Sequence, residues 1–369
     1  MLCFAFASSS DFTLPILSSI YHHQGQNLSE IAQTQAKNLP LALLPEEFAQ
    51  IWVQLPSNFW SLPLLNQKYK LGLVITQAAH QNRGKTIKNP VESWAKEHKI
   101  QSFTPHKISQ EIETLSSFKL DLGIVASYGQ ILSTKVLAVP NFGWINWHPS
   151  KLPKYRGPTP MQSFIASGQD ETALTWIEMA KGMDSGPMIL QINQELEPSS
   201  NIVDLALKMG NLGANTWAIV ACLHLYQQTF EQYEFSMVQN PDEASTCQLL
   251  DKNDAQVKPE TQTAWQIWNH FRAYKNFPGS RFLSQYFKQD VKLVELDFEV
   301  LAQQSKQFDL SFRELLSNSG VLDPKNIFGE FYKQKNQIYL ICQDQTLLPV
   351  KTVQLLETNS KISLAGYNF

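Results

Sequence analysis

The sequence predicts an α/β domain with a mostly parallel sheet, followed by a smaller domain that is mostly β. Two observations predict this fold class. Continuous apolar runs bounded by turn residues alternate with helical patterns over the first part of the chain, which is typical of parallel strands covered on both faces. After residue 242 the pattern changes to one helix and short alternating strands. The length of 369 residues agrees with two domains.

The N-terminal elements follow from apolar runs and cap residues. We expect strands at residues 2–7, 71–76, 120–127 and 144–147. Helices are expected at 13–20 and 92–98, and residues 172–179 and 187–192 form a strand pair across a Gly-containing turn. A helix then begins at residue 202 after Ser200, a possible cap, and stops at Gly210; a second surrounds residues 219–223.

The C-terminal elements are one helix and several strands. We expect the helix at residues 263–272 and strands at 292–298, 337–341 and 347–353.

Composition excludes several classes of protein. Hydrophobic residues are 43% and charged residues 17%, which argues against a disordered chain. The net charge of -3 argues against a globally basic nucleic-acid coat protein. Four cysteines without a C-x-x-C pair argue against a disulfide scaffold and a cysteine-built zinc site. No apolar run reaches membrane length and the cysteines fit a reducing compartment, so we expect a cytoplasmic protein that needs no membrane. We also expect a monomer that needs no metal.

The densest polar cluster spans residues 146–158 and follows an apolar strand. Ligands bind at the carboxyl ends of strands in open α/β sheets. Asn146 and His148 are two residues apart, so an extended strand places both side chains on one face. An amide can hold a developing oxyanion while an imidazole manages a proton, which suits chemistry at a carbonyl. A lone histidine there is more often structural, but Asp184 on a later tight turn offers a carboxylate partner.

These residues resemble a known family. WINWHPSKLPKYRGPTP followed by ALTWIEMAKGMDSGPMI resembles the signature of the folate-dependent formyltransferases: an Asn-x-His pair, a Ser-x-Leu-Pro loop, an Arg-Gly-x-x-Pro segment and an Asp-Ser-Gly turn. ITQAAHQNRGKTIKNPV, IVASYGQIL and FRAYKNFPGSRF resemble further segments of the methionyl-tRNA formyltransferases within that family.

The resemblance implies a domain plan. It implies a Rossmann-like formyltransferase domain over residues 1–235 with a long insertion at about 21–70. A linker over 236–245 and an oligonucleotide-binding-like (OB-like) barrel over 246–369 would follow. The insertion has no assigned function and is expected to lie on the surface.

The resemblance also implies roles for individual residues. The formyl donor would be 10-formyltetrahydrofolate and the acceptor the amino group of methionine on initiator methionyl-tRNA. Asn146 would hydrogen-bond the formyl oxygen, His148 would stabilise the tetrahedral intermediate, and Asp184 would orient His148 or a bound water. The folate-binding loop would consist of Ser150, Lys151, Leu152 and Pro153. The tRNA would be bound by Arg83, Lys85, Lys88 and Arg156.

Departures from the family pattern and the charge distribution leave alternatives open. Ser8-Ser9-Ser10, Pro149 and Lys151 replace the usual residues. Residues 71–160 hold 11 basic and 5 acidic residues, which suits a polyanion but equally a solvated surface; residues 241–369 are balanced at 14 and 15. The acceptor could instead be a small amine, such as an amino sugar nucleotide or glycinamide ribonucleotide. A third hypothesis, beside the tRNA enzyme and the small-amine enzyme, is a non-catalytic relative that binds RNA or folate.

Overall fold

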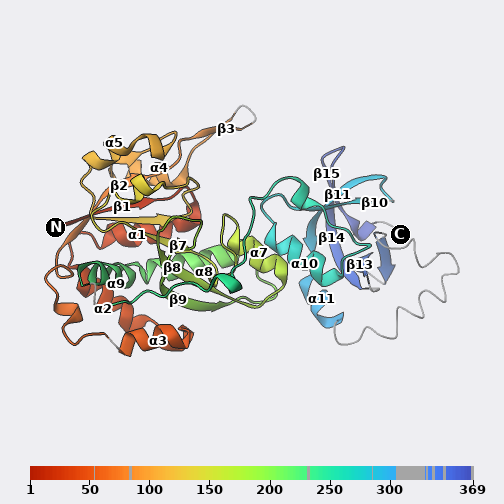
Figure 1. The fold of residues 1–369 in the computed structure, drawn as a ribbon. Coiled ribbons are helices and arrows are strands. Elements are labelled where there is room, and N and C mark those ends of the chain that lie inside the picture. The colour runs from red at the N-terminus through yellow and green to blue at the C-terminus, as the bar shows by residue number, and fades with distance from the viewer. Residues whose placement is uncertain are drawn as a thin grey trace. The chain divides into compact units, whose positions relative to one another are not determined.

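The chain forms two compact units in the computed structural model (Figure 1). The structure describes residues 1–53, 55–82, 85–230, 233–284, 286–304, 329, 331–334, 337–343 and 346–366. The first unit comprises Met1–Pro160, Glu171–Leu196 and Val203–Gln248. The second unit comprises Met161–Asp170, Glu197–Ile202 and the described part of Leu249–Phe369.

The first unit is built on a mixed, mostly parallel sheet. Its seven strands, counted over the described residues, have the order β5-β2-β1-β6-β7-β8-β9, and β8 runs antiparallel to both of its neighbours. The strands are β1 (Leu2–Ala7), β2 (Tyr69–Ile75), β5 (Ser102–Phe103), β6 (Leu122–Ala126), β7 (Trp144–His148), β8 (Glu171–Glu178) and β9 (Met188–Glu195). A short hairpin of β3 (His80–Asn82) and β4 (Lys85–Ile87) follows β2. The α/β fold class is therefore confirmed for this unit.

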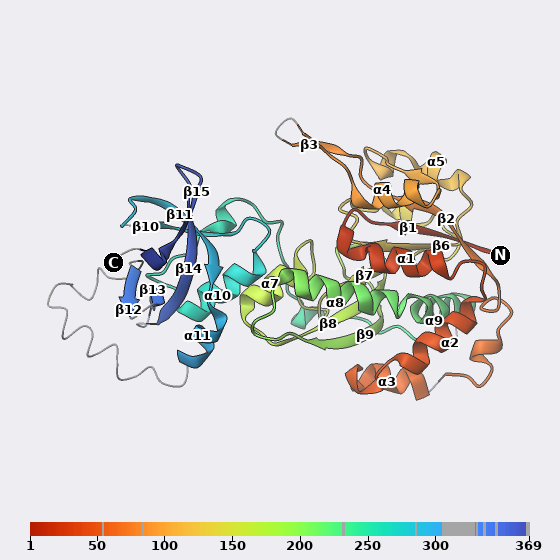
Figure 2. The same cartoon turned by 180° about the vertical axis from the view of Figure 1, so that it is seen from behind.

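Helices cover both faces of this sheet, so its central strand β1 is apolar without alternation. All six residues of β1 are buried. Ala5 packs in one core with Leu115 of α5 (Ile112–Ser117). On the other face, the ring of Phe4 lies edge-on to Trp217 of α9 (Trp217–Thr229), with ring centres 6.4 Å apart. Figures 1 and 2 show α5 and α9 on opposite sides of the sheet.

The remaining helices of the first unit lie between these strands or, for α8, after the last of them. They are α1 (Leu14–His22), α2 (Leu28–Asn38), α3 (Glu46–Val53), α4 (Pro90–Glu97), α6 (Thr134–Leu137) and α8 (Ile202–Ala214). Local sequence signals explain several of their starts. The Asn89 side chain accepts hydrogen bonds from the backbone N–H groups of Val91 and Glu92, and Pro90 occupies the first turn of α4.

The segment expected as an insertion, residues 21–70, is folded and packed against the unit. The side chain of Gln35 on α2 donates to the carbonyl of Ala214 and accepts from the N–H of Ala218, joining α2 to α8 and α9. The ring of Phe59 stacks on Tyr226 of α9 at 4.8 Å. This segment therefore extends the hydrophobic core on the side of the sheet that α9 covers.

The expected helix stop at Gly210 is wrong, because α8 continues to Ala214. A Cβ atom at Gly210 would lie 2.3 Å from the carbonyl oxygen of Phe12. The glycine therefore permits a close approach between α8 and the backbone after β1, rather than a cap.

The second unit contains an antiparallel sheet, as expected for a mostly-β domain. Over the described residues, five strands follow the order β10-β11-β14-β13-β12, and β15 pairs with β14. The strands are β10 (Ser280–Ser284), β11 (Gln289–Leu296), β12 (Phe331–Gln334), β13 (Gln337–Ile341), β14 (Leu347–Leu355) and β15 (Ser360–Ser363). The helices are α7 (Pro160–Ser167), α10 (Ala264–Ala273) and α11 (Phe298–Gln304). A capping box of Thr263 and Gln266 begins α10, and its Ile267 packs on the sheet core with Leu340.

No helix within the described ranges is both long and apolar enough to span a membrane.

Candidate active site

The carboxyl ends of the parallel strands form one edge of the first unit's sheet. Ser8, directly after β1, donates its N–H to the carbonyl of Ile75 at the end of β2. The Ser9 hydroxyl donates to the carbonyl of Tyr128, just beyond β6. The Ser10 and Ser127 hydroxyls lie 3.0 Å apart. The triple-serine turn thus uses one backbone N–H and two hydroxyls to join the ends of neighbouring strands.

Strand β7 carries two polar side chains at this edge, and both are buried. Asn146 and His148 are 6% and 4% exposed. Trp147 between them donates its indole N–H to the carbonyl of Met209 on α8, so it points to the face that α8 covers. The alternation of the strand therefore places Asn146 and His148 together on the opposite face, as their spacing predicts.

Asp184 comes from the loop between β8 and β9 and reaches both side chains. The Asn146 amide nitrogen donates to Asp184 Oδ1 over 3.3 Å, and His148 Nδ1 lies 3.6 Å from Asp184 Oδ2. The same Oδ2 accepts the backbone N–H of Gly157 over 2.9 Å. The amide, the imidazole and the carboxylate therefore converge, although Asp184 is more than 30 residues from the other two.

The loop after β7 fixes the histidine ring from its other side. His148 Nε2 lies 3.0 Å from the backbone carbonyl oxygen of Tyr155, which can only accept a hydrogen bond. Nε2 therefore carries a proton in this arrangement, and both ring nitrogens face oxygen acceptors. The negative charge of the Asp184 carboxylate stabilises a positive charge on such a ring.

The backbone of Asp184 is in the left-handed region, with φ +49°. A non-glycine residue adopts this conformation at a cost of order 1–3 kcal/mol and needs its surroundings to hold it there. Gly186, two residues on, contributes to the tight turn, because a Cβ there would lie 1.8 Å from the carbonyl oxygen of Glu178.

The expected folate loop divides into two buried and two half-buried residues. The Ser150 hydroxyl donates to the carbonyl of Lys154, and the carbonyl of Ser150 accepts from the hydroxyl of Thr175. The Leu152 carbonyl accepts from Gln191 on β9. Ser150 and Leu152 thus anchor the loop, whereas Lys151 and Pro153 are half-buried and Lys151 forms an ion pair with Glu171. Pro149 lies at the centre of a turn in which Ser150 N–H donates to His148 O, and its fixed φ suits that turn.

The four residues expected to bind tRNA have different surroundings. Arg83 lies outside the described residues; Lys85 begins β4, and Lys88 is exposed just after that strand. Arg156 donates from Nε and Nη2 to the side-chain oxygen of Gln239, over 3.0 and 2.7 Å. At least part of its guanidinium is therefore used inside the unit, and its tRNA role stays a prediction.

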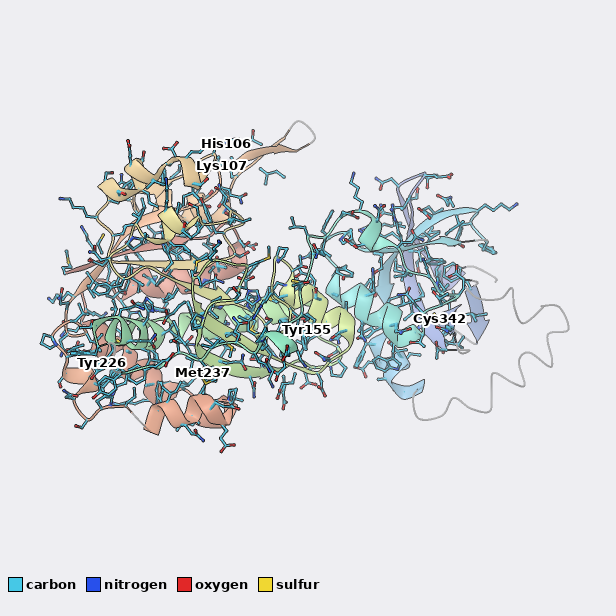
Figure 3. The ribbon with its side chains drawn as sticks, viewed as in Figure 1. His106, Lys107, Tyr155, Tyr226, Met237 and Cys342 are labelled. Carbon is cyan, nitrogen blue, oxygen red and sulfur yellow. The ribbon has the colours of Figure 1, made fainter. Side chains whose placement is uncertain are left out.

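Sequence reasoning missed Gln239, which falls inside the expected linker over residues 236–245. The structure places Met237 in an antiparallel bridge with Met188 of β9, so this segment packs on the first unit (Figure 3). No motif marks Gln239, because its partners are distant in the chain.

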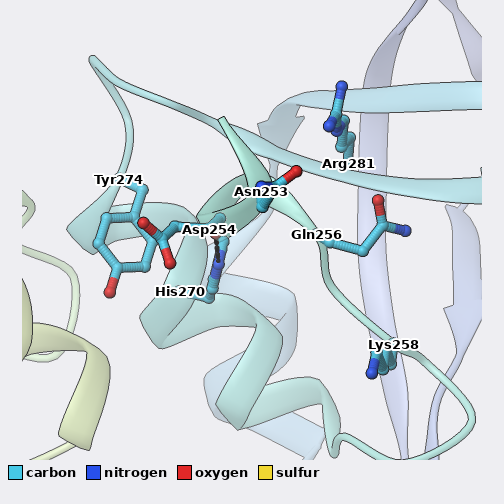
Figure 4. A pocket seen from close by; sticks show the side chains of 7 residues that line it. All are labelled: Asn253, Asp254, Gln256, Lys258, His270, Tyr274 and Arg281. Atoms are coloured by element: carbon cyan, nitrogen blue, oxygen red, sulfur yellow. Dashed lines mark hydrogen bonds between the residues drawn. The ribbon is translucent and has the colours of Figure 1, made fainter. Parts of the chain in front are cut away.

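The second unit has a polar pocket of about 580 Å³ (Figure 4). Its lining carries the cations Lys258 and Arg281, the carboxylate of Asp254 and the ring of His270. His270 lies 2.7 Å from both the Ser280 hydroxyl and the carbonyl oxygen of Asp254. Burial lowers the pKa of His270, against the opposing effect of that carbonyl. Within the residues that the structure describes, neither unit holds a cluster of three His, Cys, Asp or Glu side chains fit for a metal.

Comparison with known proteins identifies the family of both parts of the chain. The model of the family "Formyl transferase" matches residues 62–221, and that of "Formyl transferase, C-terminal domain" matches residues 249–364. A methionyl-tRNA formyltransferase from Mycoplasmopsis pulmonis is 30% identical over 258 residues, which cover 67% of this chain and 87% of the relative. One from Thermotoga maritima is 31% identical over 240 residues, which cover 64% and 72%.

Solved structures share the fold at low identity. An N-formyltransferase from Helicobacter canadensis, in complex with folinic acid and dTDP-3-aminofucose, superposes with a TM-score of 0.54 and 14% identity. That match covers 95% of this chain and 99% of the other. A sugar 3N-formyl transferase, in the presence of dTDP and 5-N-formyl-THF, gives a TM-score of 0.51 at 14% identity over 95% and 97% of the two chains. From the family models and the relatives at 30% identity or more, the chain belongs to the formyl transferase family.

Proposed function

We propose that this protein transfers the formyl group of 10-formyltetrahydrofolate to the amino group of methionine on initiator methionyl-tRNA. The observation that carries the reaction class is the convergence of Asn146, His148 and Asp184 at the carboxyl edge of the sheet. The acceptor is proposed from the similarity to methionyl-tRNA formyltransferases over two thirds of the chain. The donor is proposed from the family and from related structures that hold folates.

The chemistry required is acyl transfer between two nitrogen atoms. The amine nitrogen attacks the formyl carbon, and the carbonyl electron pair moves onto oxygen. The tetrahedral intermediate collapses with cleavage of the bond from carbon to N10 of the folate. The amine loses one proton and N10 gains one, so the products are the N-formyl amine and tetrahydrofolate.

Each of the three side chains has a role that its geometry allows. An amide nitrogen carries two N–H groups, so Asn146 can donate one to Asp184 and the other to the oxyanion. Because Nε2 of His148 already carries a proton, Nδ1, the nitrogen that faces Asp184, takes the proton that the amine loses, and the ring becomes an imidazolium. Asp184 stabilises that charge, directly or through a water, and holds Asn146 in place.

Ser150 and Leu152 would hold the loop that receives the folate, with Lys151 and Pro153 nearer its surface. In the same proposal Arg83, Lys85 and Lys88 reach the acceptor end of the tRNA, and Arg156 contributes to tRNA binding.

The decisive experiment offers the purified chain 10-formyltetrahydrofolate with three acceptors in parallel: charged initiator tRNA, an amino sugar nucleotide and glycinamide ribonucleotide. We expect N-formylmethionine on the tRNA, detected by mass spectrometry after deacylation. Formylation of a small amine alone would replace the tRNA assignment by a small-molecule formyltransferase. Binding of folate without formylation of any acceptor would favour a non-catalytic relative.

A further inference from the structure

Gln239 is a buried residue in the segment after α9 whose side chain joins the two loops that carry the site. It is 4% exposed. Its amide nitrogen donates to the carbonyls of Asp184 and Gly186, each over 2.8 Å. Its amide oxygen accepts from Nε and Nη2 of Arg156, over 3.0 and 2.7 Å. Two donor hydrogens and two acceptor lone pairs are thereby used, which is all that a side-chain amide offers.

The chemistry of these partners fixes which way the amide faces. A guanidinium can only donate, and backbone carbonyls can only accept. A rotation of the amide by 180° would bring N–H groups against N–H groups and oxygen against oxygen. The orientation is therefore determined by Arg156 and by the Asp184 loop themselves.

The two loops joined by Gln239 are the ones that touch the catalytic imidazole. One holds Asp184 in its left-handed backbone conformation, with its carboxylate at His148 Nδ1. The other supplies the Tyr155 carbonyl to His148 Nε2 and the Gly157 N–H to Asp184 Oδ2. A displacement of either loop moves an oxygen atom that lies against the imidazole.

Gln239 itself is placed by backbone pairing rather than by the site. Met237 exchanges two backbone hydrogen bonds of 2.8 Å with Met188 of β9. Further along, Arg156 donates its N–H to the carbonyl of Ser245, and Cys247 donates its N–H to the carbonyl of Arg156. The segment is thus tied to β9 on one side of Gln239 and to the Arg156 loop on the other.

We propose that Gln239 is a positioning residue for formyl transfer: it holds the Asp184 carboxylate against His148 by clamping the Asp184 loop to Arg156. This inference rests on the proposed function of the site. Gln239 touches neither His148 nor the reacting atoms, so its effect runs through Asp184. Because small misplacements of a catalytic group cost large factors in rate, loss of the clamp lowers kcat more than it raises KM.

The test uses Gln239→Glu, which keeps the size of the side chain and the Arg156 pair but sets a carboxylate oxygen against two carbonyls. We expect kcat to fall about 10- to 100-fold, with KM for donor and acceptor changed by less than about threefold. Gln35→Glu is the matched control. The amide of Gln35 on α2 also bridges two segments, the end of α8 and the start of α9, and it contacts neither loop of the site. We expect it to lower the melting temperature while kcat stays within about twofold of wild type.

A double-mutant cycle separates positioning from general destabilisation. In an Asp184→Asn background, Gln239→Glu should cost less than about threefold in kcat, because the carboxylate that it positions is already gone. Full additivity of the two substitutions would overturn the inference. The wild-type activity on methionyl-tRNA is measured first, so a failure of the proposed function is seen separately.

Hydrogen exchange gives a readout that needs no activity. In Gln239→Glu, and in the neutral Gln239→Met should the first variant not fold, amide exchange should accelerate in peptides covering residues 153–160 and 182–188. The Gly157 N–H, bonded to Asp184 Oδ2, is the reporter. Unchanged exchange in both peptides would show that Gln239 does not hold these loops, whichever substrate the enzyme uses.

Discussion

His148 and Asp184 face each other across 36 residues of sequence, with Nδ1 of the imidazole 3.6 Å from Oδ2 of the carboxylate. The distance is longer than a hydrogen bond, and the same carboxylate oxygen already accepts the N–H of Gly157. The interaction is therefore mainly electrostatic, and in the proposed reaction it would increase when the ring gains a proton. The arrangement fits a group that stabilises an imidazolium rather than one that takes its proton.

Asn146→Ala should remove the side-chain donor to the oxyanion and leave the fold intact. Loss of one oxyanion donor typically costs about 10²–10³ in kcat. The melting temperature should change little, since the amide makes one long hydrogen bond of 3.3 Å. Steady-state kinetics and thermal unfolding check the two expectations.

Asn141→Ala is the matched control for that variant. Asn141 also donates its amide to an aspartate, Asp121, but on the exposed surface at the other end of β6. We expect wild-type kcat for it. Near-wild-type turnover of Asn146→Ala would contradict the role proposed for Asn146.

Gly157→Ala should destabilise the unit and impair catalysis together. Gly157 has φ +121°, and a Cβ there would lie 2.4 Å from the carbonyl oxygen of Cys247. The loop must shift, and its N–H then leaves Asp184 Oδ2. We expect a loss of about 2 kcal/mol or more in the free energy of unfolding, with a reduced kcat.

Gly25→Ala separates the cost of backbone conformation from the cost of crowding. Gly25 has φ +84° with nothing within 4 Å of a built Cβ. The Gly25→Ala variant should lose only about 1–2 kcal/mol in the free energy of unfolding and retain full kcat. Equal losses of stability in the two variants, measured by chemical unfolding, would contradict the crowding at Cys247.

The pattern of strands and the pair on β7 could be predicted because both follow from local periodicity. Apolar runs located β1, β6 and β7 to within a few residues, and a spacing of two placed Asn146 and His148 on one face. The convergence of Asp184 with them could be inferred only through the family resemblance. It depends on the long-range pairing of β7 with β8, which no local pattern encodes.

Other features were beyond the sequence for physical reasons. Gln239 donates to the backbone carbonyls of Asp184 and Gly186. Every residue has such a carbonyl, so the sequence contains no signal for these contacts. Gly210 carries the pattern of a helix stop, but it is a glycine because the backbone of Phe12 comes close. Within residues 21–70, Gln35 and Phe59 contact α9, which is more than 160 residues further along the chain, and no local pattern encodes such a contact.

Arg83→Ala tests the division between donor and acceptor binding. If Arg83 contacts a tRNA phosphate, its loss should raise KM for the tRNA. It should also reduce the slope of the logarithm of the tRNA binding constant against the logarithm of the salt concentration by about 1. The KM for 10-formyltetrahydrofolate should stay unchanged. Kinetics at several salt concentrations provide both numbers.

Lys37→Ala removes one exposed positive charge on α2 and serves as the control for Arg83→Ala. We expect it to leave the KM for tRNA and its salt dependence as in wild type. A loss of folate affinity in Arg83→Ala would instead assign this residue to the donor.

His270 should make the stability of the second unit depend on pH. Burial lowers its pKa in the folded protein, whereas the unfolded side chain titrates near 6.5. As pH falls through about 6.5, the unfolded state binds a proton that the folded state does not, so the free energy of unfolding decreases until pH reaches the lowered pKa.

His270→Gln lacks this titration, and its stability relative to wild type should improve as pH falls. Hydrogen exchange in α10 from pH 5 to 8, corrected for intrinsic rates, measures the local free energy of opening. If the free energy of opening differs between wild type and variant by the same amount over this whole range, burial does not lower the pKa of His270.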